Sequence, residues 1–325
     1  GDGGAALRAL SGVLGVVAIG LTWLVARCHL DGRGTAAVVA VMASSPFAIR
    51  YGTEVRMYSL LLVLLLAGHL VLVAAWRRSE FRRLGGVAAV TAALLFTHYW
   101  SLFLVVVVAV VLTGAALRGS VPVRRSARRM LGAVALGAAP FAAWLPVLAG
   151  QMAHTGTPWA SAPRPTVVVA LTLEAFGGGK GSEALLVAVA TSVLVAWGIG
   201  SRSDAEEARI GWTDLPWLRA AALVGGATMV VGAGLSLAVD GAFQGRYAVY
   251  CFVPVVLAAA VGVGRLPGRA GPWALAVLVL LSGVSVAREL TRDRTQVGVI
   301  AEAVVATAMV GDHVVFCPDQ LAPAG

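Results

Sequence analysis

The chain alternates long apolar segments with short arginine clusters, and this alternation limits what it can fold into. Eight runs are long enough, or nearly so, to cross a bilayer as helices, because a hydrocarbon core of about 30 Å needs roughly 20 apolar residues. These runs cover residues 10–26, 35–49, 57–76, 130–149, 184–200, 220–239, 247–263 and 272–288. With 59% hydrophobic and 13% charged residues, the sequence predicts an all-α polytopic membrane protein.

A further apolar stretch lies between Arg83 and Arg118 and is interrupted at Thr97–Trp100. One crossing would place the arginine clusters at 77–83 and 118–129 on opposite sides of the membrane, against the tendency of positive charge to stay inside. Two short crossings keep both clusters inside and bring the total to about ten membrane segments. We therefore expect His98 at an outer turn, although the first arm is too short to span unless other helices bury it.

This topology collects the polar residues of the loops on one face of the membrane. The predicted inner loops, which carry 16 of the 25 lysines and arginines, are residues 27–33, 77–83, 118–129, 201–219 and 264–269. The predicted outer loops hold a mixed set of polar side chains: Arg50, Glu54, Arg56, His98, His154, Glu174, Lys180, Asp240 and Arg246. The outer face is therefore where we expect chemistry.

The densest outer group is the segment from Arg50 to Tyr58, just before an apolar run. Thr53 is predicted to be the N-cap of the following helix, with Glu54 in its first turn. Arg56 would then oppose the helix dipole and point about 200° away from Glu54 on a regular helix. A bound external phosphate would resolve that conflict, with Arg50 as a second cation. The alternative is a lipid-headgroup anchor.

A second outer cation precedes another membrane entry, in the segment Gln244-Gly245-Arg246-Tyr247. Arg246 repeats the position of Arg56 at the outer mouth of a helix, and two such arginines on one face suggest a common anionic ligand. A headgroup anchor is again the alternative. Tyr58 fits either a binding site or the aromatic belt of the membrane interface. His98 could donate a hydrogen bond to a ligand or cap a broken helix.

The longest outer loop, residues 150–183, contains the apolar stretch Thr166–Phe176, which we interpret as an interfacial or re-entrant helix. A glycine run follows, which predicts a mobile loop around Lys180. The spacing does not match a nucleotide-binding phosphate loop, so we reject such a site. Lys180 could still reach an anionic substrate when the loop closes.

The end of the chain changes character. Residues 296–309 are predicted to form a helix and residues 313–317 a strand. We expect a membrane domain over residues 1–289 and the beginning of a small extracytoplasmic α/β domain over residues 290–325.

Other ligand classes find little support in the sequence. Cys28, Cys251 and Cys317 are far apart and follow no metal spacing, so neither a disulfide framework nor a metal site is predicted. The net charge of +9 is explained by the inner loops rather than by nucleic-acid binding.

Four segments carry a resemblance by their order and spacing. They are Ala6–Ser11, Ser45-Pro46 followed by Tyr51, Glu54, Arg56, Met57 and Tyr58, then Thr97-His98-Tyr99, and finally Gln244-Gly245-Arg246-Tyr247 with Pro254. In these segments the chain resembles the GT-C superfamily of membrane glycosyltransferases, in the branch with protein O-mannosyltransferases and lipid A aminoarabinose transferases. The similarity spans nearly all of the membrane part.

The resemblance implies transfer of mannose or a similar hexose or pentose from a polyprenyl-phosphate donor, with inversion, at the outer face of a bacterial plasma membrane. The acceptor would be a glycan, a lipid or a protein, and no cofactor is implied. The expected donor-phosphate residues are Arg56, Arg246 and Arg50. The expected substrate-binding residues are Glu54, Tyr58, His98, Tyr99, Tyr247 and Lys180.

The family's catalytic base is an acidic residue of a first external loop, which has no counterpart here. Asp2 lies too close to Leu7-Arg8 to fill that role. We therefore expect the base upstream of Gly1 and the chain to be a fragment. The alternatives are a transporter or flippase of lipid-linked sugars, or a membrane binding protein without catalysis.

Overall fold

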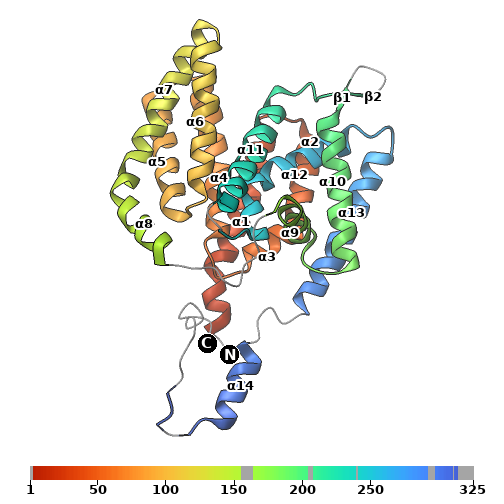
Figure 1. Cartoon of the computed structure of the whole chain (residues 1–325). Coiled ribbons are helices and arrows are strands. Elements are labelled where there is room, and N and C mark those ends of the chain that lie inside the picture. The colour runs from red at the N-terminus through yellow and green to blue at the C-terminus, as the bar shows by residue number, and fades with distance from the viewer. Residues whose placement is uncertain are drawn as a thin grey trace. The chain divides into compact units, whose positions relative to one another are not determined.

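A computed structural model of the chain describes residues 3–154, 164–203, 208–238, 241–291, 297–309 and 311–313. These residues are mainly helical (Figure 1). Within these ranges, eight helices are long and apolar enough to cross a membrane, and a bent pair makes a ninth if it counts as one span. The expectation of an all-α polytopic membrane protein is confirmed. The chain divides into two compact units, Gly1–Val286 and Ala287–Gly325, and each is described by itself.

The elements follow one another as α1 (Gly3–Arg27), α2 (Gly32–Ser44), α3 (Pro46–Gly52), α4 (Tyr58–Arg77), α5 (Phe81–Thr97), α6 (Ser101–Arg118), α7 (Val121–Ala138), η1 (Ala139–Trp144), α8 (Leu145–His154), α9 (Pro165–Gly177), α10 (Ser182–Gly200), β1 (Ser201–Ser203), β2 (Ala208–Ile210), α11 (Pro216–Ala238), η2 (Gly245–Ala248), α12 (Val249–Gly264), α13 (Ala270–Leu290) and α14 (Val297–Thr307).

The predicted run 35–49 is not one straight helix. It breaks at Ser45, where α2 ends and α3 begins at an angle of 56°. Pro46 disfavours helical dihedrals in the residue before it, and Ser45 accordingly has an extended ψ of 123°. The Ser45 hydroxyl then caps α3 by accepting the Ala48 N–H. A single proline therefore turns the chain toward the segment that carries Arg50 and Arg56.

The interrupted stretch 83–118 forms two helices, α5 and α6, joined at residues 98–100 as expected. At 17 residues, α5 is shorter than the eight membrane-length helices. It packs between α4 and α7, with Leu94 and Leu95 buried. A Cβ on Gly137 of α7 would lie 2.2 Å from the Ala88 carbonyl oxygen of α5. Neighbouring helices thus cover one side of the short arm, whereas Phe81 and Phe96 stay exposed.

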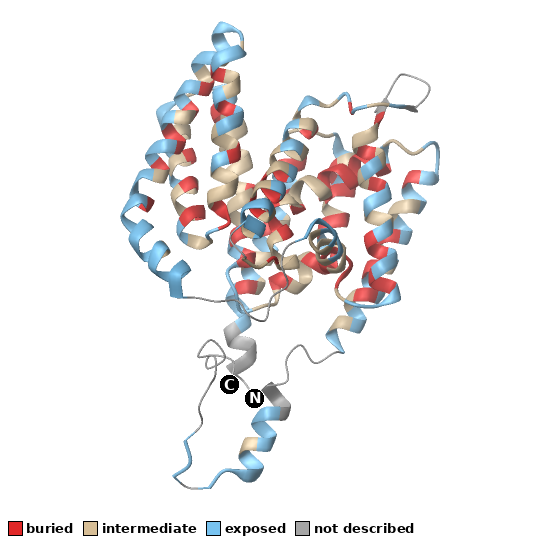
Figure 2. Cartoon of the chain, in the orientation of Figure 1, coloured by how far each residue is buried: buried red, intermediate tan, exposed pale blue. Residues whose placement is uncertain are grey.

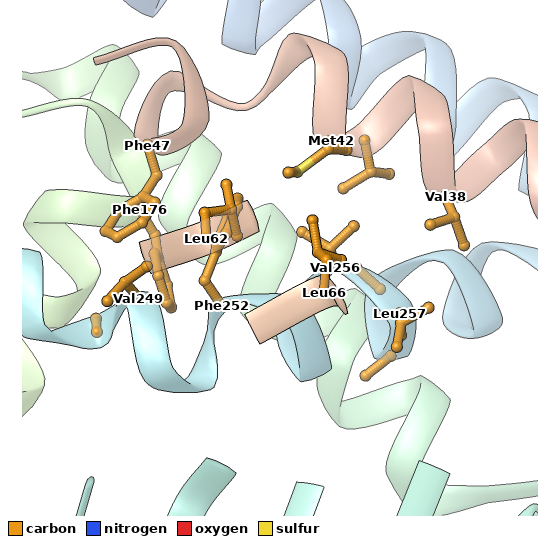
Figure 3. Close-up of a cluster of buried hydrophobic side chains, with 14 of the residues drawn as sticks. Val38, Met42, Phe47, Leu62, Leu66, Phe176, Val249, Phe252, Val256 and Leu257 are labelled. Carbon is orange, nitrogen blue, oxygen red and sulfur yellow. The ribbon is translucent and has the colours of Figure 1, made fainter. Parts of the chain in front are cut away.

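Helix α12 is the centre of the first unit. Its apolar span is 67% buried, against 22% to 33% for the other seven membrane-length helices. It packs on α10, α11, α2 and α4, and its residues Phe252, Val256 and Leu257 lie in the main core beside Met42 and Leu66 (Figure 3). In the sequence, the run that forms α12 does not differ from the other predicted membrane spans. Only the packing shows that α12 lies at the centre of the first unit.

Small residues allow α10 and α12 to approach closely. A Cβ on Gly198 would lie 2.0 Å from the Ala258 carbonyl oxygen, and a Cβ on Gly262 would lie 2.0 Å from that of Leu194. No real side chain tolerates such contacts, so both positions require glycine. Close backbone packing of this kind is typical of helices in membranes.

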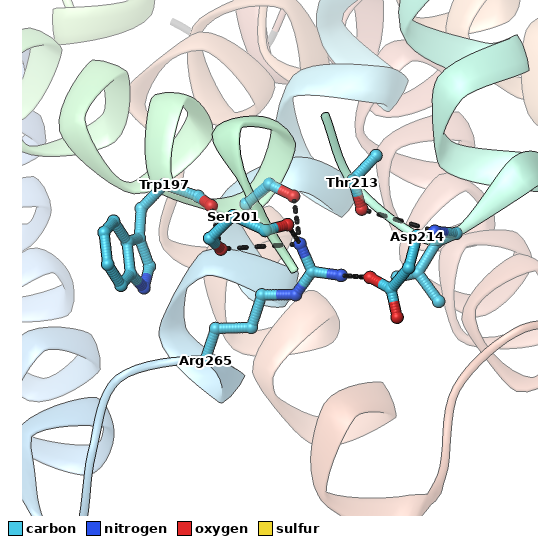
Figure 4. Close-up of polar contacts among 7 residues, drawn as sticks. Trp197, Ser201, Thr213, Asp214 and Arg265 are labelled. Atoms are coloured by element: carbon cyan, nitrogen blue, oxygen red, sulfur yellow. Dashed lines mark hydrogen bonds and ion pairs between the residues drawn. The ribbon is translucent and has the colours of Figure 1, made fainter. Parts of the chain in front are cut away.

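One arginine joins three elements at the end of α12 (Figure 4). The Arg265 guanidinium donates to the Gly198 carbonyl at 2.9 Å and to the Ser201 carbonyl, and it forms an ion pair with Asp214. Ser201 opens the antiparallel pair β1–β2, in which it faces Ile210. This small hairpin, within the predicted inner loop 201–219, was not anticipated from the sequence.

In the second unit, α14 confirms the helix predicted over residues 296–309. The predicted strand at 313–317 falls almost wholly outside the described residues. The α/β domain and its boundary at residue 290 therefore stay predictions.

Candidate functional site

The segment between α3 and α4 differs from the prediction. Thr53 is the C-cap of α3 and not the N-cap of α4, and its hydroxyl donates to the Ile49 and Arg50 carbonyls at 2.9 and 3.1 Å. Helix α4 begins only at Tyr58, after Met57, whose side chain makes no capping hydrogen bond. The prediction was wrong because α3 continues through Arg50, so the Thr53 side chain satisfies carbonyls behind it.

Glu54 and Arg56 also depart from the expected geometry. They lie in a bend rather than in a helix, and Arg56 Nε is 3.3 Å from a Glu54 carboxylate oxygen. The expected separation of about 200° holds only on a regular helix. Glu54 is therefore a partner that holds Arg56, and the Arg56 side chain is 48% exposed.

Arg246 lies in a different environment, within the short 3-10 helix η2. Its guanidinium carbon is 6.0 Å from the Tyr58 ring centre and 5.9 Å from that of Tyr247. Its Nε atom is buried and has no hydrogen-bond partner among the described residues. An unpartnered buried donor costs about 1–3 kcal/mol, so this arrangement is poor for stability alone. The charged Nε–H group of Arg246 is therefore available to donate a hydrogen bond to a bound anion.

Packing of η2 against α9 positions Arg246. A Cβ on Gly245 would lie 2.5 Å from the Leu171 carbonyl oxygen of α9, so glycine is needed beside Arg246. On the other side, the Tyr247 ring packs on Trp100 with centroids 4.6 Å apart. The buried Phe243 ring also packs on Trp100. Arg246 is thus held between α9 and the start of α6.

His98 faces the same space from the α5–α6 turn. Its Nδ1 atom accepts the Trp100 backbone N–H at 3.1 Å and lies 3.4 Å from the Tyr250 hydroxyl, which is bonded in turn to Ser101 at 2.9 Å. Burial, and then the Arg246 charge, lower the pKa of His98 to about 4. The ring is therefore neutral near pH 7. Because Nδ1 accepts, the proton resides on Nε2, which is the donor.

These contacts bring four predicted residues together. The His98 ring centre is 5.7 Å from that of Tyr58 and 5.5 Å from that of Tyr247, and Arg246 lies beside both tyrosines. Tyr51 extends the group, with its ring 5.3 Å from Tyr58. Its hydroxyl is within electrostatic reach of four charged side chains: Arg50, Glu54, Arg56 and Arg246. Both predicted arginine segments thus border one aromatic cluster.

Tyr99 is directed elsewhere. Its hydroxyl donates to the Gln151 side chain and accepts the indole N–H of Trp144 at 3.1 Å, and its ring lies near Phe141. These partners belong to η1 and α8. Although Tyr99 follows His98 directly, its side chain therefore contacts η1 and α8 rather than the rings around His98.

The glycine run before Lys180 is packed. Gly177 and Gly178 are buried, and the Ser285 hydroxyl donates to the Gly177 carbonyl at 2.6 Å. Gly178 has a φ of 95°, and a Cβ there would lie 2.7 Å from Pro46. These two glycines therefore allow the backbone to pack closely against Pro46 and Ser285, whereas the sequence predicted a mobile loop. Lys180 itself is exposed.

Trp100, Ser101 and Tyr250 belong to the cluster but were not predicted as site residues. Tyr250 lies four residues after Arg246, on the same face of the helix that η2 leads into. That spacing is the only signal in the sequence that could have indicated it. Asp240, another predicted outer residue, lies outside the described residues.

No group of three or more histidine, cysteine or acidic side chains suited to a metal ion occurs in the described ranges. Comparison with protein-family models, with curated proteins and with solved structures finds no match to the chain. The roles given to the site residues are therefore argued from their geometry.

Proposed function

We propose that the chain transfers a sugar from a polyprenyl-phosphate-linked donor to an acceptor on the outer face of a bacterial plasma membrane. The observation that carries the proposal is Arg246, whose buried Nε has no hydrogen-bond partner in the described part of the chain and lies beside the neutral donor His98. Guanidinium and imidazole N–H groups suit phosphate oxygens. The surrounding rings of Tyr58 and Tyr247 suit the apolar faces of a sugar or of the lipid chain.

The proposed reaction balances through the lipid phosphate. The acceptor oxygen forms a bond to the anomeric carbon, the bond from that carbon to the phosphate oxygen breaks, and the acceptor proton goes to a base. The phosphate gains negative charge as it leaves, and Arg246 and His98 would stabilise that charge. Since His98 is neutral and uses Nδ1 as an acceptor, it is a donor here and not the base. We assign the role of base to a carboxylate that lies outside this cluster.

Arg56 and Arg50 would contribute from the border of the cluster. The ion pair with Glu54 fixes Arg56 near the beginning of α4, so that its remaining N–H groups could bind a second phosphate oxygen or a sugar hydroxyl. We assign Glu54 a positioning role through Arg56. Tyr99 bonds to Gln151 and Trp144 instead, so we assign it no role in donor binding.

One observation favours the rival function, transport of a lipid-linked sugar. The α2–α3 pair is a broken helix, and transporters place ligands at such breaks. The same cationic cluster could then hold a phosphate during translocation. The two functions differ in their products, because only a transferase breaks the sugar–phosphate bond.

Sugar transfer is tested with the native protein in proteoliposomes. A polyprenyl-phosphate mannose labelled in the sugar is supplied on the outer side, and label is followed into lipid-free products. Released polyprenyl phosphate together with transferred label supports the proposal, and Arg246→Gln should strongly reduce both. Intact donor that moves between leaflets would establish transport instead. The control is Arg33→Gln, at an exposed position distant in sequence from the cluster.

A further inference from the structure

Helices α5, α6 and α7 carry positive charge without negative charge. Between residues 81 and 173 the sequence contains no aspartate or glutamate. Arginines nevertheless cluster where α5 begins and where α6 turns into α7: Arg82, Arg83, Arg118, Arg124, Arg125, Arg128 and Arg129. Any counterion for this cluster must come from Glu80 or from outside these helices.

Four of these arginines share one face of α7. At 100° per residue, Arg124, Arg125, Arg128 and Arg129 span an arc of about 140°, and all four are exposed. The opposite face of the same turns packs inward, since Met130 is buried in the core that α7 shares with α5 and α6. The rest of the first unit therefore leaves the arginine face uncovered, and in Figure 2 the turn between α6 and α7 is coloured mainly as exposed.

Arg83 differs from these arginines because its guanidinium group has partners within the protein. Arg83 pairs with Glu80 at 3.4 Å and donates to the Ala74 carbonyl at 3.0 Å. Within the described ranges, no side-chain hydrogen bond or ion pair involves the four arginines of α7, Arg82 or Arg118. Their donors are available to an external anion.

The level of this face along the helices fits a lipid headgroup layer. Two reverse turns separate α5 from α7, so the two helices run in the same direction. Gly137 of α7 lies against Ala88 of α5, so seven residues earlier in each helix Met130 lies level with Phe81. The arginines at 124–129 thus lie at and just beyond the start of α5. They spread over about 7 Å along the axis, which matches a headgroup layer about 5–7 Å thick.

Apolar side chains flank the charged ones at this end. Phe81 is 91% exposed, Leu117 70% and Val121 68%. A surface that combines uncovered arginines with uncovered apolar groups suits a molecule with an anionic head and an acyl chain. Arginines that only set the orientation of the protein in the membrane would not need exposed apolar side chains beside them.

We propose that this arginine face of α7, with Arg82 and Arg118, binds the phosphate groups of anionic phospholipids in the leaflet on the predicted inner side. Guanidinium groups would bind the phosphodiester oxygens, and acyl chains would pack beside Phe81 and Leu117. The proposal is independent of the proposed transferase function, because these residues lie at the other end of α5 and α6 from His98.

The test uses the purified full chain in nanodiscs of phosphatidylcholine with increasing phosphatidylglycerol, and counts retained lipids by native mass spectrometry. We expect the wild type to retain phosphatidylglycerol preferentially and to lose the preference at high salt. The variant R124Q/R125Q/R128Q/R129Q should lose about tenfold or more of that preference. The corresponding variant with four lysines should keep most of it.

Equal retention of the two lipids by the wild type would overturn the proposal, and so would an unchanged preference in the glutamine variant. A matched variant, R33Q/R78Q/R269Q, removes exposed inner arginines outside this face and should keep the preference. If it loses the preference equally, the binding is nonspecific and the proposal fails. Should the glutamine variant not insert, the wild-type salt series and the lysine variant still decide the question.

Discussion

The Nδ1 atom of His98 accepts the backbone N–H of Trp100 at 3.1 Å. This one contact assigns the ring proton to Nε2, because a neutral imidazole carries a single N–H. Since Trp100 also packs on Tyr247, the turn that orients His98 supports the residue beside Arg246 as well. The same turn therefore orients the His98 donor and packs against Tyr247, the neighbour of Arg246.

The first prediction concerns acid stability. The pKa of His98 is lowered to about 4 in the fold, below the value near 6.5 expected in an unfolded chain. The unfolded state therefore binds more protons between these values, so stability present above pH 6.5 is lost as the pH falls toward 4. His98→Asn should flatten this part of the pH profile by an amount on the order of 1–3 kcal/mol. Thermal unfolding from pH 7 to pH 4 measures the difference, and parallel profiles would contradict it.

The second prediction separates function from stability at Arg246. Arg246→Gln should lower the efficiency of sugar transfer by about 10²–10³-fold, the effect of removing one donor that stabilises developing charge. Thermal stability should change little, because within the described ranges the buried Nε has no hydrogen bond to lose. Transfer assays and unfolding of the same preparation measure both. A strongly destabilised variant would show that Arg246 is structural.

The third prediction concerns the approach of α10 to α12. Gly198→Ala and Gly262→Ala each place a Cβ 2.0 Å from a carbonyl oxygen, so each should destabilise the protein by about 1–3 kcal/mol or more through overpacking. Gly226→Ala in α11 is the matched control, since no atom lies within 4 Å of its added Cβ. It should be neutral or slightly stabilising. Equal melting temperatures for all three would refute the packing argument.

The fourth prediction ranks two partners of the Arg265 cluster. Arg265→Ala should destabilise more than Asp214→Ala, because Arg265 also caps the carbonyls of Gly198 and Ser201. The Arg265 side chain is 7% exposed, whereas that of Asp214 is 43% exposed. The ion pair itself is therefore partly screened, and its loss should cost about 1 kcal/mol or less. Denaturant unfolding of both variants gives the order, and the reverse order would contradict it.

Several features followed from local pattern. Run length predicted the membrane helices, and the charge of the flanking loops predicted that the stretch 83–118 forms two helices around His98. Both inferences use rules that depend only on neighbouring residues. Thr53 shows where such rules fail, because its pattern suits the start of one helix or the end of another. Only the length of α3, set by packing, distinguishes the two.

The candidate site required contacts between distant segments. Arg56 and Arg246 look alike in the sequence, since each stands before a membrane helix. In the fold Arg56 has a carboxylate partner from its own bend, whereas Arg246 has a buried Nε beside His98, a residue 148 positions away in the chain.

Hydrocarbon thickness and the cost of burying charge act on each segment separately, so the membrane class and most helix positions can be deduced from the order of residues alone. Which arginine is buried among aromatic rings, which imidazole nitrogen donates, and which helix lies at the centre depend on how segments pack against one another. Packing is a property of the whole chain, and here it distinguishes Arg246 from the other arginines.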